Sequence, residues 1–254
     1  MINFAKMKQK LKKNNLSNSA FWIGGKHVVE TALKNSKRKI HKFILHKKLE
    51  GVKFDQNFKI KPEYANDSFF RKIFNDEIPH QGYALLVEKL QEINLKYYLE
   101  QNTIFNIIAL DGITDPRNIG SIIRTAVAFG CDAILINRKD FNSKSFLLYK
   151  AASGAMENII ILEVSNIHNE IKLLKKNNFW VVGMDGSATQ SLYDYKVELK
   201  NVFIFGSENA GMKKLMIENC DTICKIPISP KIESLNVSNA VASTLSVLNF
   251  NNRK

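Results

Sequence analysis

The sequence is poor in cysteine and has no long hydrophobic run. Its three cysteines, Cys131, Cys220 and Cys224, fit a reducing compartment, so we expect the protein in the cytoplasm. Cys220 and Cys224 lie four positions apart with no second pair of ligands nearby, which argues against a structural zinc site, and no metal is expected. No segment approaches the ~18 consecutive apolar residues of a membrane span. The basic segment 6–13 leads into polar residues, whereas a secretory signal would continue into an apolar core.

Two common nucleotide-binding patterns are also missing. The chain has no G-x-G-x-x-G after its first strand, so it lacks the dinucleotide-binding fingerprint. The glycine-containing loop GSENAG at 206–211 has no Lys-Ser/Thr pair, which a phosphate loop requires. These absences exclude the usual dinucleotide and nucleoside triphosphate enzymes. The hydrophobic content of 45% and the charged content of 24% remain those of an ordinary globular protein.

The positive charge is unevenly distributed along the 254 residues. Residues 1–104 contain 20 Lys and Arg against 10 Asp and Glu, whereas residues 105–254 contain 17 against 14. No acidic residue precedes Glu30. A basic half joined to a nearly neutral half is typical of a polyanion-binding module attached to a second function. The alternative is a general abundance of lysine, which is common throughout this sequence together with Asn and Ile.

The N-terminal part is predicted to be a small α/β domain behind a flexible tail. Residues 1–20 are rich in Lys and Asn and are predicted to form a basic, mobile tail. Residues 21–87 are of domain size, and residues 88–103 read as a polar helical linker. Within the domain, apolar spacing and turn residues predict helices at 27–33 and 61–74 and strands at 40–45 and 83–87.

Residues 104–254 show a different pattern, in which short apolar runs are separated by helical spacing. Buried strands that alternate with helices indicate an α/β fold with a parallel sheet covered on both faces. Ligands of such sheets bind beyond the carboxyl ends of the strands. The predicted strands are 104–110, 133–136, 159–162, 179–182, 202–205 and 222–226.

The loop after the first of these strands, DGITDPRNIGSIIR at 111–124, contains two candidate site residues. Asn118 follows Pro116 closely and is predicted to lie at the start of a helix that runs to residue 129. Arg124 lies six positions further along, near the middle of that helix. Taken alone, Arg124 would be an ordinary arginine on a solvated face, which is the usual case for a lone arginine.

Two later loops are also unusual. In GSENAG, two glycines flank the acidic Glu208 and allow the backbone to approach a ligand closely. The segment 226–242, IPISPKIESLNVSNAVA, reads as a strand end stopped by proline, a polar loop and a helix. Ser234 or Asn236 is placed to cap that helix, whose first N–H groups can hold a polar ligand. The alternative is a strand-loop-helix joint in which both residues only cap.

Taken in order, the three loops resemble the motifs of a known family. They read N-x-G-x-x-x-R-x-A at 118–126, F-G-S-E-N-A-G at 205–211, and I-P-I followed by E-S-L-N-V-S-N-A at 226–240. This order and spacing resemble the SpoU family, the 2′-O-ribose RNA methyltransferases of the SPOUT superfamily, over about residues 104–250. The resemblance implies a parallel sheet whose C-terminal segment is threaded into a trefoil knot, an exception to the rule that chains are not knotted. It also implies a homodimer and an S-adenosylmethionine pocket made by the knotted loops.

The N-terminal part resembles the L30e-like RNA substrate-binding domain of one branch of that family. IGGKHVVETAL at 23–33 matches its opening, and PHQGYAL at 79–85 matches its closing element. Tyr83 stands where a smaller apolar residue is usual, and Pro230 stands where many members have glycine. The branch is typified by a bacterial enzyme that acts on a guanosine ribose of large-subunit ribosomal RNA, and the resemblance implies the same substrate class.

The resemblance also implies a role for each candidate residue. Arg124 occupies the position of the family's proposed base. Because a guanidinium is effectively always protonated, its alternative role is to bind the adjacent phosphate and stabilise the 2′-alkoxide as it forms. Glu208 would orient Arg124 or accept a hydrogen bond from the ribose. The implied cofactor-binding residues are Gly206, Ile226 and Leu235, and the residues that position the nucleotide are Asn118, Ser234 and Asn236.

We therefore expect an S-adenosylmethionine-dependent enzyme that methylates a ribose 2′-hydroxyl of a guanosine in large-subunit ribosomal RNA and acts as a homodimer. Two alternatives stay open. One is the same reaction on transfer RNA, whose enzymes usually lack such an N-terminal domain, and the other is a non-catalytic RNA-binding protein of the same fold. The C-terminal helix carries apolar residues that must be buried, either against a second copy or in the chain's own core: Val237, Val241, Leu245 and Leu248.

Overall fold

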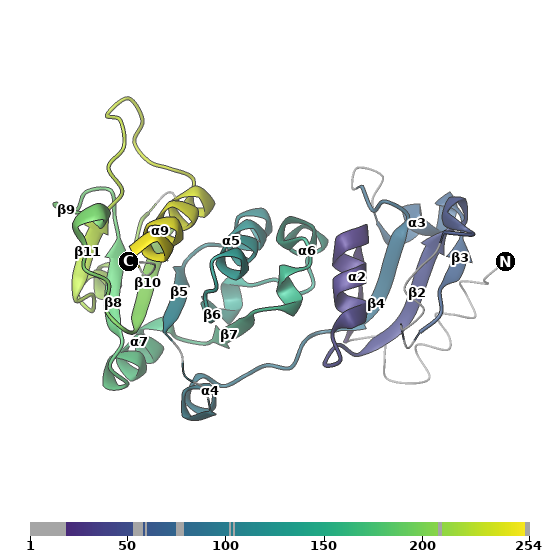
Figure 1. Cartoon of the computed structure of the whole chain (residues 1–254), viewed down its shortest axis with the longest axis horizontal. Coiled ribbons are helices and arrows are strands. Elements are labelled where there is room, and N and C mark those ends of the chain that lie inside the picture. The colour runs from purple at the N-terminus through teal and green to yellow at the C-terminus, as the bar shows by residue number, and fades with distance from the viewer. Residues whose placement is uncertain are drawn as a thin grey trace. The chain divides into compact units, whose positions relative to one another are not determined.

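The computed structural model describes residues 19–52, 58, 60–74, 79–101, 103, 105–207 and 210–251 (Figure 1). The chain forms two compact units: Met1–Gln91 with Ser143–Glu157 make up unit 1, and Glu92–Asn142 with Asn158–Lys254 make up unit 2. Residues 1–18 of the predicted tail and the candidate residue Glu208 lie outside the described residues. Within the described ranges, no helix has the length and apolar character needed to cross a membrane.

Unit 1 is built around a small mixed sheet with the strand order β1-β4-β2-β3. The central strands are antiparallel, whereas β3 pairs with β2 in parallel. The elements are β1 (Ala20–Gly24), α2 (Lys26–Lys34), β2 (Ile40–His46), the 3-10 turn η1 (Lys47–Leu49), β3 (Glu63–Ala65), α3 (Asp67–Ile73) and β4 (Tyr83–Glu88), together with α6 (Phe146–Ala152) and the 3-10 turn η3 (Ala155–Glu157).

The predicted helix at 27–33 and the predicted strands at 40–45 and 83–87 are confirmed, but the helix predicted at 61–74 is shorter than expected. Its first residues form β3, because Tyr64 and Ala65 pair with Leu45 and His46 of β2. The helix α3 begins only after Asn66. Strand pairing to a distant part of the chain overrides the local helical spacing here.

Residues 143–157 are packed into unit 1 through aromatic side chains. The Tyr149 ring centroid lies 5.5 Å from that of Phe21, and the Phe146 ring centroid lies 4.7 Å from that of Phe74. The domains predicted from the sequence, 21–87 and 104–254, are each one continuous segment, and this division stays a prediction. The compact units differ from it in placing this segment with the N-terminal elements.

Unit 2 contains a seven-stranded sheet in the described residues, with the order β7-β6-β5-β10-β8-β11-β9 and every pairing parallel. Its strands are β5 (Asn106–Asp111), β6 (Ala133–Asn137), β7 (Ile160–Val164), β8 (Trp180–Met184), β9 (Gln190–Ser191), β10 (Asn201–Gly206) and β11 (Thr222–Lys225). Its helices are α4 (Leu95–Gln101), α5 (Pro116–Ala128), α7 (Ile167–Lys176), α8 (Lys214–Ile217) and α9 (Val237–Asn251), with 3-10 turns η2 (Arg138–Asp140) and η4 (Leu192–Asp194). The predicted parallel α/β fold and its six strands are confirmed, and only the two-residue edge strand β9 was missed.

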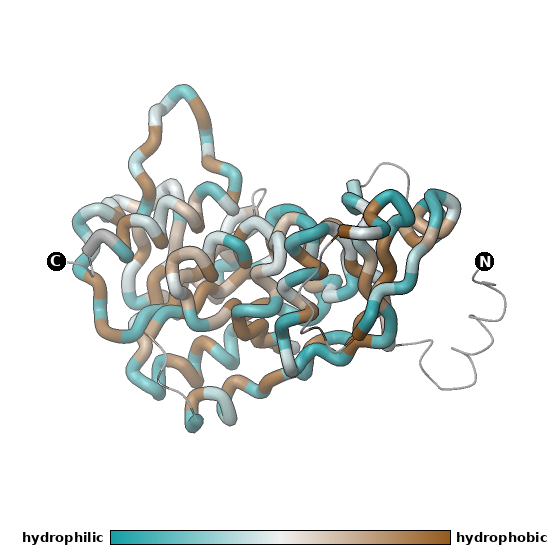
Figure 2. Tube along the Cα trace, turned by 45° about the vertical axis from the view of Figure 1, so that its right-hand side comes forward, coloured by the Kyte–Doolittle hydropathy of each residue, from teal (hydrophilic) through white to brown (hydrophobic). Residues whose placement is uncertain are grey.

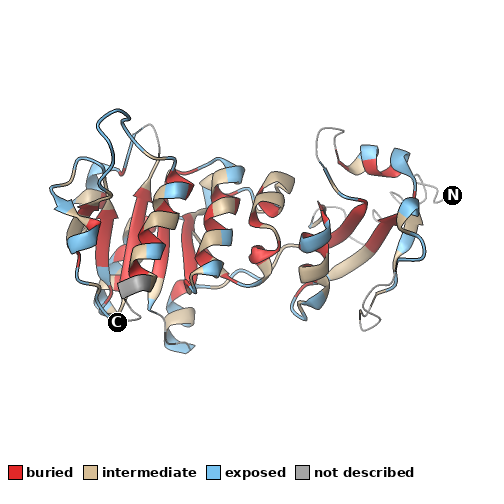
Figure 3. Ribbon diagram, turned by 45° about the horizontal axis from the view of Figure 1, so that its top comes forward, coloured by how far each residue is buried: buried red, intermediate tan, exposed pale blue. Residues whose placement is uncertain are grey.

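Alternate residues of the central strands face opposite sides of the sheet, and both sides are covered. Ile107 and Ala109 of β5 belong to a core cluster with Ile171 and Leu174 of α7. The opposite side of the sheet is covered by α5 and α9, which lie next to each other (Figure 3). Leu95 of the predicted linker is also buried in the first cluster, so part of 88–103 belongs to the core of unit 2.

The apolar residues of α9 find their burial within this chain. Val237, Val241, Leu245 and Leu248 are each no more than 5% exposed. Of the two accounts open at the sequence level, burial in the chain's own core is therefore the one that the structure shows. These four side chains consequently give no argument for a second copy.

The fit of residues 143–157 in unit 1 depends on a glycine. Gly154 has a φ of +88°, and a Cβ there would lie 2.6 Å from Thr31 Oγ1 and 3.2 Å from the His27 carbonyl oxygen. Gly51 has the same φ of +88° but nothing within 4 Å of the equivalent Cβ. The two positions therefore separate backbone strain from crowding.

We expect Gly154→Ala to destabilise the protein more than Gly51→Ala. Both substitutions incur the cost of a positive φ, about 1–2 kcal/mol. Gly154→Ala should cost about 1–3 kcal/mol more, because the added methyl group overpacks against Thr31. Thermal unfolding of the two variants and the wild type measures the difference. Equal losses of stability would show that the space around Gly154 is not limiting.

Candidate active site

A cavity of unit 2 lies at the carboxyl ends of β8, β10 and β11. Its volume is about 190 Å³. Three segments form its walls: the residues after β8, the loop after β10 and the segment between β11 and α9. Its lining combines apolar side chains with glycines, two serines and two carboxylates: Met184, Phe205, Ile226, Ile228, Leu235, Val237, Ala240, Gly186, Gly206, Gly211, Ser207, Ser234, Asp185 and Glu233.

The loop after β10 is closed by hydrogen bonds between its own ends. The Gly211 N–H donates to the Ser207 carbonyl at 2.8 Å, and the Ser207 N–H donates to the Gly211 carbonyl at 3.2 Å. A Cβ on Gly206 would lie 2.1 Å from the Gly211 carbonyl carbon and 2.2 Å from the Met212 nitrogen. Glycine at 206 is therefore required by the contact of the chain with itself.

A buried carboxylate at the end of β5 anchors the far end of the same loop. Asp111 is only 5% exposed, and its Oδ2 accepts a hydrogen bond from the Lys213 backbone N–H at 3.1 Å. Its Oδ1 accepts a second bond from Lys213 Nζ at 2.9 Å. The sequence analysis did not select either residue. The available signal was an acidic residue directly after a buried parallel strand, where ligand sites concentrate.

The first and third motifs meet at the starts of α5 and α9. The Asn236 Nδ2 group donates to Asn118 Oδ1 at 3.1 Å. Asn236 is also the residue that caps α9, since its Oδ1 accepts the Ser238 N–H at 3.0 Å and the Ser238 hydroxyl at 2.6 Å. Asn118 lies in the first turn of α5, which is capped by Asp115. Ser234 is exposed and lines the cavity.

The segment between β11 and α9 projects from the rest of unit 2 (Figure 1). Residues 227–234 are all exposed, including Ile228 and Ile232, and apolar and polar residues alternate along the segment (Figure 2). Ile226, Ile228 and Leu235 contribute apolar groups to the cavity at the two ends of the segment.

Arg124 is not brought to this cavity by its own chain. It is exposed on α5, whose buried face is formed by other residues, and among the described residues that line the cavity it is absent. Six residues of helix place it about 9 Å along the axis from Asn118. Among the described residues, the cavity lining thus includes four of the predicted site residues: Gly206, Ile226, Ser234 and Leu235. Asn236 and Asn118 bind each other at the helix starts, and neither they nor Arg124 belong to that lining.

The cavity has two carboxylates that the sequence analysis did not select, Asp185 and Glu233. Asp185 follows β8, and its Oδ1 accepts hydrogen bonds from the Ser187 N–H at 2.8 Å and the Ser187 hydroxyl at 2.6 Å. Glu233 is exposed and precedes Ser234 in the third motif. Two carboxylates beside apolar walls favour a ligand that carries both an aromatic ring and positive charge.

The cysteines near the cavity do not provide a reactive or metal-binding thiolate. Burial raises the pKa of Cys224, in β11, to about 11, and burial raises the pKa of Cys220 to about 11 as well. Both side chains are therefore thiols at neutral pH. In the part of the chain that the structure describes, no group of three or more His, Cys, Asp or Glu is arranged to hold a metal ion.

Fold and site together define the class of protein: an α/β enzyme with an all-parallel sheet and a ligand cavity at the carboxyl ends of its strands. The family model of the SpoU rRNA methylase family matches residues 106–246. The chain belongs to this family, and its sequence-based recognition as an RNA 2′-O-methyltransferase is confirmed.

Individual relatives agree with this membership. The 23S rRNA (guanosine-2′-O-)-methyltransferase RlmB of Yersinia pestis is 35% identical over 169 residues, which are 65% of this chain and 69% of RlmB. A protein of Staphylococcus epidermidis named for the TrmH family of tRNA/rRNA methyltransferases is 31% identical over 87% of this chain and 91% of its own length. The crystal structure of the SpoU methyltransferase AviRb of Streptomyces viridochromogenes, in complex with AdoMet, has the same fold, with a TM-score of 0.81 at 17% identity over 97% of this chain and 94% of AviRb.

We expect Gly206→Ala to disrupt the cavity. The new methyl group cannot occupy the space that Gly211 and Met212 fill, so the loop must move. Binding of S-adenosylmethionine, the ligand in the AviRb structure, should weaken by at least about tenfold, since overpacking costs 1–3 kcal/mol. Isothermal titration measures the affinity. Gly186→Ala is the matched control for folding, because it also lines the cavity but has nothing within 4 Å of its Cβ. A Gly206→Ala variant with unchanged stability and affinity would contradict the contact.

Proposed function

We propose that this protein transfers a methyl group from S-adenosylmethionine to the ribose 2′-hydroxyl of a guanosine in large-subunit ribosomal RNA. The main support is that the second and third motif segments line one cavity at the carboxyl ends of β8, β10 and β11, and that Asn236 of the third motif binds Asn118 of the first. The similarity to RlmB over 65% of the chain supports the choice of ribosomal RNA and of guanosine.

The cavity has the chemistry that S-adenosylmethionine requires. Phe205, Ile226 and Leu235 offer apolar surface to an adenine ring, and Gly206 and Gly211 expose backbone beside it. Asp185 and Glu233 supply negative charge for a ligand that carries a sulfonium and an ammonium group. When bound, the cofactor supplies an activated methyl group. We infer that Gly206, Ile226 and Leu235 hold it largely through backbone groups, as the family resemblance implies.

The protein's task in this reaction is to align the ribose and stabilise charge. Asn118 and Asn236, which meet at the helix starts, and Ser234, which lines the cavity, would position the nucleotide. Arg124 would bind the adjacent phosphate and stabilise the 2′-oxygen as its proton leaves, because its guanidinium stays protonated. Glu208 would orient Arg124 or accept a hydrogen bond from the ribose, a role that rests on the motif alone.

We also infer a trefoil knot. The chain runs from β11, near one edge of the sheet, to α9. Helix α9 contacts α5 and also β10, a strand in the middle of the sheet. On the way the chain passes the loop after β10, whose residues line the same cavity. This return path is what threading of the C-terminal segment requires, and the family resemblance gives it as a knot.

A homodimer would explain how an Arg124 side chain can reach the cavity. Since the arginine is exposed on α5 and absent from the described lining of its own cavity, a second copy can present its Arg124 to the site. A two-fold interface is reciprocal, so each cavity would then receive the arginine of the other chain. The apolar residues of α9, in contrast, are buried in their own chain and give no support for a dimer.

Mixing two impaired variants tests the shared site. We expect Arg124→Ala to lower the methylation rate by ~10²–10³ while binding of S-adenosylmethionine is retained. At a limiting S-adenosylmethionine concentration, Gly206→Ala should have at most about one tenth of the wild-type activity, because its disrupted cavity binds the cofactor more weakly. If the site is shared, each mixed dimer has one working site of two, so an equimolar mixture, in which about half of the dimers are mixed, regains about one quarter of the wild-type sites. Methyl transfer by the mixture at the level of the separate variants would place Arg124 in its own chain's site.

Unit 1 is proposed to be the L30e-like domain that recognises the RNA. Lys26 and His27 are exposed at the start of α2, and the Lys26 N–H donates to Gln81 Oε1 at 3.0 Å. The turn at Gln81 and Gly82 has φ angles of 57° and 78°. His80 shapes this turn, because its Nδ1 accepts the Gly82 N–H at 3.0 Å.

His80 would contribute to RNA recognition by unit 1 through its shape and its hydrogen bonding. Its ring stacks on Phe70 at a centroid distance of 4.5 Å. Burial and the neighbouring His46 lower the pKa of His80, so the ring is neutral at physiological pH and charges only at more acidic pH. The attraction for phosphates is left to exposed lysines such as Lys26, Lys47 and Lys48.

Methylation of defined RNAs tests the proposed function. We expect the purified protein, with labelled S-adenosylmethionine, to modify a 23S ribosomal RNA fragment carrying the peptidyl-transferase loops and to leave transfer RNA unmodified. Nuclease digestion of the product should give a 2′-O-methylguanosine. Preferential modification of transfer RNA would favour the first alternative. Binding of RNA without cofactor binding or methyl transfer would favour the non-catalytic alternative.

A further inference from the structure

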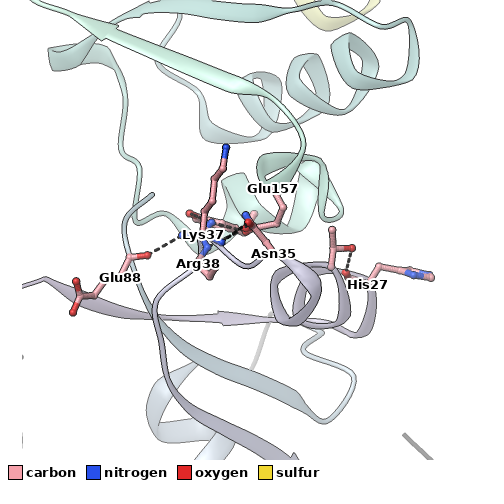
Figure 4. A network of polar contacts seen from close by, with 8 residues as sticks. His27, Asn35, Lys37, Arg38, Glu88 and Glu157 are labelled. Atoms are coloured by element: carbon pink, nitrogen blue, oxygen red, sulfur yellow. Dashed lines mark hydrogen bonds and ion pairs between the residues drawn. The ribbon is translucent and has the colours of Figure 1, made fainter. Parts of the chain in front are cut away.

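Unit 1 contains a buried ion pair between Arg38 and Glu157, whose side chains are 0% and 2% exposed (Figure 4). The guanidinium Nε donates to Glu157 Oε2 at 3.1 Å, and one terminal nitrogen donates to Glu157 Oε1. The other terminal nitrogen donates to the Glu88 carbonyl at 2.8 Å. Asn35 Nδ2 donates to Glu157 Oε2 at 2.7 Å, and the Tyr149 hydroxyl lies 3.4 Å from the guanidinium.

The Arg38–Glu157 pair is better explained by the position that it fixes than by a gain in folding stability. Removing two charges from water is costly, and well-packed apolar residues commonly stabilise a protein at least as well as a buried pair. A guanidinium bound to both carboxylate oxygens, however, fixes distance and direction, which apolar contact does not. The Arg38–Glu157 pair therefore holds the segment of Glu157 in one defined position on unit 1.

Glu157 lies at the point where the chain returns from unit 1 to unit 2. Residues 143–157 interrupt unit 2 between β6 and β7, and Glu157 is the last residue before the chain re-enters unit 2. Only two residues separate it from Ile160, where β7 begins. The two units are therefore joined by three passages of the chain, one at each end of 143–157 and one after Gln91.

We propose that Arg38 and Glu157 are positioning residues for the RNA-dependent step: by fixing 143–157 on unit 1, they tie the RNA bound there to the catalytic unit. The proposal rests on the proposed function. Each further tether raises the effective concentration of bound RNA at the cavity, whereas one flexible linker leaves it low. Loss of the pair frees the segment and leaves RNA binding and cofactor binding in place.

The test compares Arg38→Met, Glu157→Met and the double variant, each as full-length protein. For each single variant, the single-turnover rate with saturating 23S fragment and S-adenosylmethionine should fall about ten- to a hundredfold, since misplacement of reacting groups has costs of this size. The dissociation constants of RNA and S-adenosylmethionine should stay within about threefold of wild type. Amide hydrogen exchange should rise in 143–157 and stay unchanged in β10 and β11.

The double variant and a neighbouring lysine serve as controls. In the double variant two methionines can pack where the ion pair was, so thermal stability should return, but the rate should stay low because apolar contact does not fix the direction of the segment. Lys39→Met removes the same charge one position away, from a side chain that is 67% exposed and paired with Glu88, and should leave the rate within about twofold.

Unchanged rates in the single variants would overturn the proposal. So would a parallel loss of cofactor affinity, which marks general destabilisation, or a double variant that regains the wild-type rate through apolar packing alone. An equal effect of Lys39→Met would point to lost charge and would also overturn it. A wild-type protein that methylates no RNA would remove the proposed function itself, and this proposal with it.

Discussion

The parallel pairing of β10 between β5 and β8 is the constraint on which the site depends. Its register places Gly206 opposite Asp111 and Phe205 opposite Met184. Strand β11 pairs with β8 so that Cys224 also lies opposite Met184. Because the strands run in one direction, their ends coincide at one edge of the sheet. Three segments distant in sequence therefore begin within a few residues of one another, and the cavity forms where they diverge.

Crowding at this edge holds both ends of the loop after β10 in place. Gly206 touches the backbone of Gly211 and Met212, and Asp111 holds Lys213 from the neighbouring strand. Both ends of the loop after β10 are thus fixed by its own chain. Methyl transfer from a sulfonium asks little covalent chemistry of the protein, so its contribution is alignment and electrostatics. A backbone pocket held in this way, with apolar walls, meets the first requirement.

Features with a local signal could be predicted from the sequence, and features set by distant contacts could not. The six strands of unit 2 and the helix starting near Asn118 follow from apolar periodicity, and the capping role of Asn236 follows from residue type. By contrast, β3 forms because Tyr64 meets Leu45, and residues 143–157 join unit 1 through Tyr149 and Phe146. The Asp111 contact to Lys213 joins residues 102 positions apart. Nothing in the local sequence records such pairings.

The distribution of charge fits the proposed division of RNA binding and chemistry between the two units. The cavity presents Asp185 and Glu233, which suit a cationic cofactor and repel phosphate, while the exposed lysines of α2 and η1 belong to unit 1. Attraction to phosphates is long-range, independent of sequence and weakened by salt. Such attraction can hold an RNA near a basic surface, the role proposed for unit 1, but cannot align one 2′-oxygen with a methyl group, which requires accuracy of about an ångström. Binding becomes useful for the reaction only through directional contacts within the chain, and the buried Arg38–Glu157 pair is a contact of that kind.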